Sequence, residues 1–184
     1  MDNGASSYRR FLDGDDAALN ELIRSYSDGL TLYINSITRN ICIAEELTEE
    51  VFVELCVKRP RFSGKSTFKT WLFAIARHTA IDWLRKAEKK RLVPIDDYYN
   101  MADKEDIERE YLKTEQKAQL HKALDRINPD HAQVLYLVYF ENFSNSETAD
   151  IMKKSNRQIE NLLYRAKQSL KEELRREGFV YEEL

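Results

Sequence analysis

The stretch at residues 66–91, STFKTWLFAIARHTAIDWLRKAEKKR, constrains the fold of this 184-residue chain more than any other. Its mostly apolar positions recur at the i, i+3, i+4, i+7 and i+8 spacing of a helix with one broad buried face. These positions are Phe68, Trp71, Leu72, Ile75, Ala76, Thr79, Ala80 and Trp83. Cations fill other faces and the C-terminal end, namely Lys69, Arg77, Arg85, Lys86, Lys89, Lys90 and Arg91. The pattern predicts a packed helix with a strongly basic edge.

The composition of the chain favours an all-α fold. Only 5 Gly and 3 Pro are present, and the alternating β-branched pattern that marks strands is almost absent. A chain of 184 residues has the length of one or two small domains. Its 42% of hydrophobic and 33% of charged residues are typical of a globular, soluble protein.

The sequence gives no sign of a metal site, a cofactor or a membrane segment. Cys42 and Cys56 are too few and too isolated for a disulfide framework or a zinc site. The histidines, His78, His121 and His131, have no ligand-like spacing. No apolar run approaches the length of a membrane span, and the N-terminus lacks a signal-peptide pattern. We therefore expect a cytoplasmic protein without metal or cofactor and without direct membrane insertion.

The net charge of −3 conceals a strong segregation of charge along the chain. Residues 58–91 carry 11 Lys and Arg against 2 Asp and Glu, a net charge of +9, whereas residues 1–57 carry −7 and residues 92–116 carry −5. A basic block inside an acidic protein indicates a localised face for a polyanion. Because bases stack on aromatic rings while cations follow the phosphates, the rings and cations of this block suit strand-separated DNA.

Further helices are expected on the N-terminal side of the basic one. Residues 1–14 are predicted to be frayed, and residues 15–28 and 30–40 to form a helical hairpin. Residues 43–58, IAEELTEEVFVELCVK, have the periodicity of a helix. Pro60 is expected to end that helix, because proline lacks an N–H group and disfavours helix in the preceding residue.

The helix expected at residues 43–58 has two contrasting faces. Leu47, Val51 and Leu55 form the apolar one. The other side is lined by Glu45, Glu46, Glu49, Glu50 and Glu54. An acidic face of this kind is either simply solvated or a docking surface for a basic partner. Spacing alone does not separate the two interpretations.

An acidic linker is expected between two helical domains. Residues 92–114 break the helical periodicity and separate a domain at residues 1–91 from one at residues 115–184. The second domain is predicted to hold four helices, one of them capped by Asn128 with Pro129 at its first position.

Two capping boxes follow in the second domain. Ser144-Asn-Ser-Glu147 precedes a short helix, and Ser155-Asn-Arg-Gln158 precedes a long one. A short capped helix, a tight turn and a longer capped helix make a helix-turn-helix. On this evidence alone the chain could be a repressor or activator that acts by itself, with its first domain as a sensor.

The motifs together resemble a known family. The run LTEEVF…FSGKSTFKTWLFAIARHTAIDWLRK resembles region 2 of the extracytoplasmic-function (ECF, group 4) RNA polymerase sigma factors. The run LHKALDRINPDHAQVLYLVYFENFSNSETADIMKKSNRQIENLLYRAKQSL resembles region 4 of the same family. The resemblance covers roughly residues 15–177. Two ordered blocks across a linker favour a sigma factor over the stand-alone regulator.

The resemblance implies an alternative sigma factor with no enzymatic activity of its own. Such a factor binds core RNA polymerase, through the β′ clamp helices and the β flap, and directs it to particular promoters. It would help to open the duplex at the −10 element. Promoter DNA and an anti-sigma factor are the other partners that the resemblance implies, and no small-molecule substrate is expected.

The resemblance also assigns residues of the first domain. Those that match the polymerase-docking positions are Glu46, Glu49, Glu50 and Phe52, the last expected to be an exposed aromatic. Those that match the −10 element positions are Phe62, Lys65, Ser66, Phe68, Lys69, Trp71, Arg77, His78 and Arg85. His78 stands where many members have Asn, so the family's base preference does not carry over. Phe68 either captures a flipped base or is the first core residue of its helix.

In the second domain, the −35 element is expected to be read by the second helix of the helix-turn-helix. The matching residues are Arg157, Gln158, Glu160, Asn161, Tyr164, Arg165 and Lys167. Glu160 and Leu162 stand where many members have a cation. Glu160 either accepts a hydrogen bond from cytosine or weakens binding by repelling phosphates.

Overall fold

The computed structural model describes residues 3–90 and 115–176, and the regular elements in these two stretches are all helical. The first stretch contains α1 (Asn3–Leu12), α2 (Asp16–Thr38), α3 (Ile41–Lys58) and α4 (Phe68–Lys90). The second contains α6 (Glu115–Arg126), α7 (Pro129–Leu135), the π-helix η1 (Tyr136–Phe140), α8 (Asn145–Met152) and α9 (Asn156–Arg176). The predicted all-α class is confirmed. Within these stretches, none of the helices combines the length and apolarity needed to cross a membrane.

The first helix, α1, corrects the prediction of a frayed N-terminus. Tyr8 and Phe11, three residues apart, lie on one face of α1 and are each only 1% exposed. Gly4 lets the helix come close to its neighbours, because a Cβ there would lie 2.5 Å from both the Phe68 ring and the Tyr26 hydroxyl. Two aromatic residues among polar ones are a weak local signal, and contacts with α2 and α4 decide that this segment folds.

A single long helix, α2, replaces the predicted hairpin of two helices. It continues through Gly29, although glycine inside a helix costs about 1 kcal/mol relative to alanine. Leu22, Leu30 and Ile34 on its buried face compensate for this cost. The side chain of Glu141 lies directly against Gly29, where a Cβ would be 2.7 Å from its Oε1. The glycine therefore provides room for a neighbour and does not form a turn.

The helices α3 and α4 begin close to the predicted positions and are capped by side chains. The Asn40 side chain accepts a hydrogen bond from the Ile43 backbone N–H, and Thr67 Oγ1 accepts one from the Thr70 backbone N–H at 3.1 Å. The apolar face predicted for α4 is only partly buried. Four of its positions are buried and four are half-buried, respectively Phe68, Leu72, Ala76 and Ala80, and Trp71, Ile75, Thr79 and Trp83. Phe73, outside the predicted stripe, is fully buried.

Both predicted capping boxes are present in the second stretch. Ser144 and Glu147 bond reciprocally at the start of α8, as do Ser155 and Gln158 at the start of α9. Asn128 accepts a hydrogen bond from Asp130 N–H at the start of α7. The sequence did not reveal that α7 passes into the π-helix η1.

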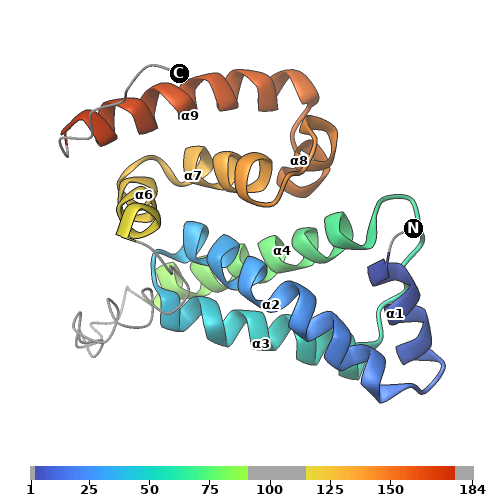
Figure 1. The fold of residues 1–184 in the computed structure, drawn as a ribbon. Coiled ribbons are helices and arrows are strands. Elements are labelled where there is room, and N and C mark those ends of the chain that lie inside the picture. Colours follow the sequence, from blue (N-terminus) through green and yellow to red (C-terminus); the bar gives the residue numbers. More distant parts are fainter. Residues whose placement is uncertain (1–2, 91–114, 177–184) are drawn as a thin grey trace.

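The two helical units pack against each other (Figure 1), and their buried side chains belong to one hydrophobic cluster. The helices α7 and α8 lie between α9 and the pair α2 and α4. Aromatic pairs join the units: Tyr33 with Tyr136 at 6.2 Å between ring centroids, and Phe73 with Phe143 at 5.1 Å. The predicted linker at residues 92–114 lies outside the described residues.

Candidate nucleic-acid interface

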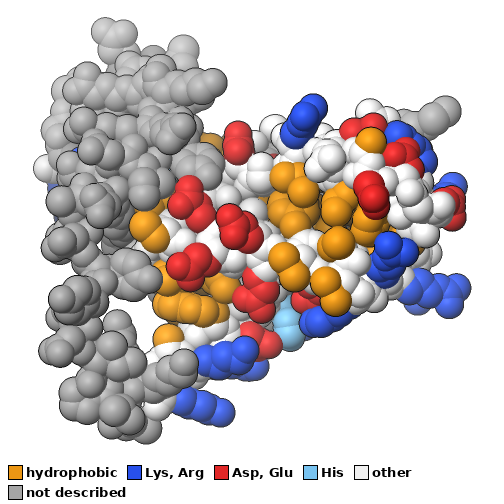
Figure 2. Space-filling model, turned by 90° about the horizontal axis from the view of Figure 1, so that it is seen from below, with side chains coloured by type: hydrophobic (Ala, Val, Ile, Leu, Met, Phe, Trp, Pro, Cys, Tyr) orange, Lys and Arg blue, Asp and Glu red, His pale blue; other side chains and the backbone are white. Residues whose placement is uncertain are grey.

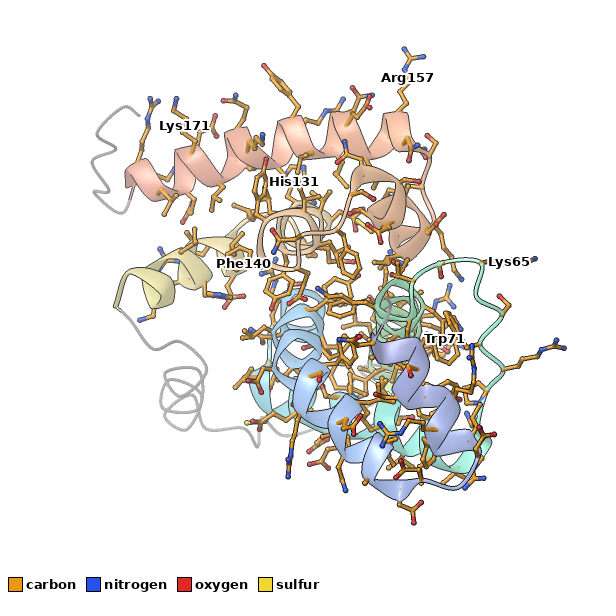
Figure 3. The ribbon with its side chains drawn as sticks, turned by 45° about the vertical axis from the view of Figure 1, so that its right-hand side comes forward. Lys65, Trp71, His131, Phe140, Arg157 and Lys171 are labelled. Carbon is orange, nitrogen blue, oxygen red and sulfur yellow. The ribbon has the colours of Figure 1, made fainter. Side chains whose placement is uncertain are left out.

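An exposed loop at residues 59–67 leads into the basic helix α4. Gly64 has φ +71°, which L-residues rarely adopt, and this allows the sharp turn. Lys65 follows it and extends from the loop into solvent (Figure 3). Ser66 is half-buried and donates a hydrogen bond to the Thr67 carbonyl oxygen at 3.3 Å. The loop thus presents a cation directly before the first turn of α4.

An aromatic cluster supports this loop from beneath. Phe62 contacts the rings of Phe68 and Trp71, with centroids 5.7 and 5.3 Å away. Trp71 is half-buried beside the loop (Figure 3), whereas Phe68 is fully buried. Tyr8 from α1 packs on both rings, 5.3 Å from Phe68 and 5.5 Å from Trp71. Of the two interpretations of Phe68, this structure therefore shows the core residue.

Tyr8 is a residue that sequence reasoning missed, because it lies in the segment expected to be frayed. Its hydroxyl donates a hydrogen bond of 2.7 Å to the carbonyl oxygen of Pro60. Burial raises the pKa of the Tyr8 phenol to about 12, and Arg59 nearby partly opposes this increase. The Tyr8 side chain thereby fixes the start of the loop.

The cations predicted along α4 have different surroundings. Lys69 and Arg77 are half-buried and bonded to the second helical unit. His78 and Arg85 are exposed, and each lies 3.5 Å from a carboxylate oxygen of Asp82. The predicted −10 set is therefore split into a part open to solvent and a part covered by other elements.

The second helix of the helix-turn-helix, α9, presents its outer face to solvent. Arg157 and Lys171 extend from α9 away from the rest of the molecule (Figure 3). The other predicted −35 residues are exposed too: Gln158, Glu160, Asn161, Tyr164, Arg165 and Lys167. Tyr164 is 68% exposed, so its phenol is available on this face. The predicted set is thus brought together on one accessible helix.

Tyr139 of η1 extends this exposed surface. It is 51% exposed, and Lys167 Nζ lies 5.3 Å from its ring centroid. Tyr139 is absent from the predicted −35 set, because its neighbours Leu137, Val138 and Phe140 are apolar and give the segment the pattern of a buried helix. Leu162 of α9 is half-buried, in keeping with its place on the apolar side of the helix.

The outer face of α3 combines acidic and apolar side chains. Glu46, Glu49 and Glu50 are exposed. Between and beside them stand Val53 and Val57, exposed by 58% and 75%. Acidic side chains gather beside hydrophobic ones on this underside of the molecule (Figure 2). It lies on the opposite side from α9 (Figure 1).

Phe52 requires a correction. It was expected to be an exposed aromatic on the acidic face, but it is only 7% exposed and belongs to the core. On a helical wheel it falls at the margin of the stripe of Leu47, Val51 and Leu55, where the neighbouring helices cover it. The same helical wheel places Val53 among the glutamates. This position could have identified Val53, from sequence alone, as the exposed apolar residue of the face.

Two family profiles match the two helical units. The profile described as Sigma-70 region 2 matches residues 22–90, and the profile described as Sigma-70, region 4 matches residues 117–170. The first match contains α3, the loop and α4. The second contains α8 and most of α9, the two helices of the helix-turn-helix.

Curated relatives resemble the chain along most of its length. The RNA polymerase sigma factor YlaC of Bacillus subtilis is 28% identical over 159 residues, which cover 85% of this chain and 92% of the relative. The ECF RNA polymerase sigma factor SigX of the same organism is 28% identical over 174 residues, with 89% and 88% covered.

Solved structures share the fold across both units. The sigma factor RpoE, crystallised with the anti-sigma factor NepR of Bartonella quintana, matches with a TM-score of 0.64 and 20% identity, over 85% of this chain and 96% of that one. CnrH, solved with the cytosolic domain of CnrY, matches with a TM-score of 0.64 and 18% identity, over 94% of each chain. The paired profiles in their order, and relatives that match over most of both chains, show that the chain belongs to the sigma-70 family of transcription initiation factors, within its ECF group.

Proposed function

We propose that this chain is an alternative sigma factor that binds core RNA polymerase in the cytoplasm, directs it to particular promoters and assists strand opening at the −10 element. It has no enzymatic activity of its own. The observation that carries the proposal is the presence, on one chain, of three separate surfaces: the acidic and apolar face of α3, the loop with the start of α4, and the outer face of α9. A stand-alone regulator would need only the last.

The face of α3 is the proposed docking surface for the β′ clamp helices. Glu46, Glu49 and Glu50 provide negative charge for a basic partner. Val53 and Val57 provide the apolar area that an interface needs near its centre. The domain that contains α9 would contact the β flap, as the family resemblance implies.

The loop and the start of α4 are the proposed −10 surface. Lys65, His78 and Arg85 are accessible. The cationic side chains of Lys65 and Arg85 can hold phosphates of a separated strand. Phe62 and Trp71 are half-buried and provide ring surface next to the loop. Phe68 supports these rings from within the core.

The outer face of α9 is the proposed −35 surface. Its exposed amide, guanidinium and phenol groups can reach base edges in a major groove, with Arg157 and Asn161 one turn apart. An anti-sigma factor is the remaining proposed partner, because both structures described above were solved with a protein of that kind or with a bound cytosolic domain.

Run-off transcription with core polymerase and a promoter library tests the proposal. The purified chain should produce transcripts from a small set of promoters that core polymerase alone does not use. A Glu49→Lys variant, altered at the docking face, should lose this activity while its affinity for promoter duplex stays that of the wild type. Tight, sequence-specific duplex binding without transcription would favour the stand-alone regulator instead.

A further inference from the structure

The π-helix η1 leaves one aromatic side chain outside the core, beside α9. The Glu141 backbone N–H donates a hydrogen bond of 3.1 Å to the Tyr136 carbonyl oxygen, five residues back, which is the π-helical pattern. Phe140 stacks on Tyr136, with ring centroids 5.1 Å apart and an interplanar angle of 6°. Tyr139, directly before Phe140, is 51% exposed. Because π-helical turns are rare and are frequently found at functional sites, this exposed ring is a candidate for a functional role.

The exposed ring of Tyr139 contacts a cation of α9. Lys167 Nζ lies 5.3 Å from the ring centroid, within the range of a cation–π interaction. Among the residues that the structure describes, Lys167 forms no ion pair, and the Tyr139 hydroxyl group forms no hydrogen bond. A ring, unlike a carboxylate, does not neutralise the ammonium charge. The contact therefore restricts where the ammonium group lies and leaves its charge available to an anion.

Lys167 lies on one flank of the proposed −35 surface. Arg165 and Lys167 are two residues apart on α9, so their side chains point to different sides of the helix. Arg165 lines a hollow of about 260 Å³ together with Lys154, on the other flank. On a helical wheel, Arg157 falls midway between Arg165 and Lys167, and it extends away from the rest of the molecule (Figure 3). The surface thus has a cation at its centre and one on each flank.

A recognition helix meets two rows of phosphates. The major groove is about 12 Å wide, and a helix with its side chains is about 10–12 Å in diameter, so a helix in the groove contacts both walls. When Arg157 is directed at the base edges, Arg165 faces one wall and Lys167 faces the other. Phosphate contacts of this kind fix the register and orientation of the helix on the duplex.

We propose that Tyr139 is a positioning residue for −35 binding, whose ring holds the Lys167 ammonium group at the flank of α9 where it binds a phosphate group of one strand. The inference rests on the proposed function, because it needs α9 to enter the major groove of the −35 element. A lysine side chain loses rotamer freedom when its ammonium group is fixed, and a ring that restricts it before DNA arrives reduces that loss. Tyr139 thus raises affinity without reading a base.

Nuclear magnetic resonance of the free full-length chain tests whether the contact exists in solution. The ε-methylene protons of Lys167 should show an upfield ring-current shift, because the side chain lies over the Tyr139 ring. The shift should disappear in Tyr139→Leu and remain in Tyr139→Phe, which keeps a ring. Lys171, one turn further along α9, extends into solvent and is the internal reference (Figure 3). Equal shifts of Lys167 and Lys171 in the wild type would overturn the proposal.

Duplex binding tests whether the contact serves DNA recognition. The full-length chain is titrated by fluorescence anisotropy with a fluorescein-labelled duplex of about 20 base pairs and random sequence, because phosphate contacts do not depend on sequence. Lys167→Gln should weaken binding and reduce the slope of log affinity against log salt concentration by about 0.9, the value for one phosphate. Tyr139→Leu should weaken binding about threefold. Tyr139→Phe should bind like the wild type.

A double-mutant cycle then decides whether Tyr139 acts through Lys167. Tyr139→Leu should have no further effect in a chain that already carries Lys167→Gln. In the matched control, Lys171→Gln removes the same charge one turn away, and Tyr139→Leu should keep its threefold effect there. Equal effects in the two backgrounds would overturn the proposal, and so would a Tyr139→Phe variant that binds as weakly as Tyr139→Leu. Urea unfolding should show near-normal stability, because Tyr139 is 51% exposed.

Failure of this inference is distinguishable from failure of the proposed function. Independent effects of Tyr139 and Lys167 would remove the positioning role and leave run-off transcription by the wild-type chain as it is. Conversely, a chain that never supports transcription would remove the proposed function, whether or not the two residues are coupled in duplex binding.

Discussion

The hydroxyl group of Tyr8 donates a hydrogen bond to the carbonyl oxygen of Pro60 over 2.7 Å, which ties α1 to the loop before α4. The Tyr8 ring also packs on Phe68 and Trp71, so one residue from the N-terminal helix contacts both the loop and the helix that it leads into. A segment that the sequence predicted to be frayed thus holds the proposed −10 surface in place.

The first prediction concerns α1 itself. The Gly4→Ala change should lower the free energy of unfolding by about 1–3 kcal/mol, because the new Cβ would lie 2.5 Å from the Phe68 ring and the Tyr26 hydroxyl. Urea denaturation measures this. Ser6→Ala, at an exposed position of the same helix, is the control and should change stability little. Equal stability of both variants would mean that α1 is not docked on α4.

The second prediction concerns Phe68. Because this ring is fully buried among Tyr8, Tyr26, Phe62 and Trp71, Phe68→Ala should cost about 3–5 kcal/mol of stability. Thermal and urea unfolding of the free chain test it. A folded variant of normal stability, with permanganate footprints showing impaired opening of promoter thymines, would instead assign Phe68 to base capture.

The third prediction separates two neighbours on α3. Val53→Asp should abolish binding to core polymerase, because it replaces apolar area on the proposed docking face with a charge. It should leave the helical circular dichroism unchanged, because the side chain is 58% exposed. Phe52→Ala should lower stability by about 3–5 kcal/mol, because that ring is buried. Pull-down with core polymerase and urea unfolding measure the two effects. The docking assignment fails if the folded Val53 variant binds core polymerase normally.

The fourth prediction concerns pH. Burial alone would raise the pKa of Glu147. Hydrogen bonds from Ser144, Thr70 and Thr67 outweigh the burial, and the pKa is lowered from its ordinary value of 4.5. The carboxylate therefore contributes stability that is fully present above pH 4.5 and is lost as the pH falls through the lowered pKa. Glu147→Gln should therefore be less stable than the wild type at pH 7, and this difference should shrink as the solution is acidified below 4.5. Glu160→Gln, an exposed control on α9, should change the stability at pH 7 little.

Several local features were predictable from sequence because neighbouring residues decide them. Both capping boxes join groups three residues apart, Ser144 with Glu147 and Ser155 with Gln158, so a short motif contains the whole interaction. The basic helix α4 follows from periodicity and from the Thr67 cap. The same holds for the exposed face of α9, whose polar positions simply lie off its apolar stripe.

By itself, the sequence determined the all-α class, the positions of the caps and the family to which the chain belongs, since these depend on spacing along the chain. The tertiary structure alone decided which residues at the edge of a stripe are buried, as for Phe52, and that Gly29 lies inside a helix against Glu141. It also decided that Lys69 meets Glu141, 72 residues away. Periodicity gives the direction of a side chain, but what covers that side chain depends on how distant helices dock.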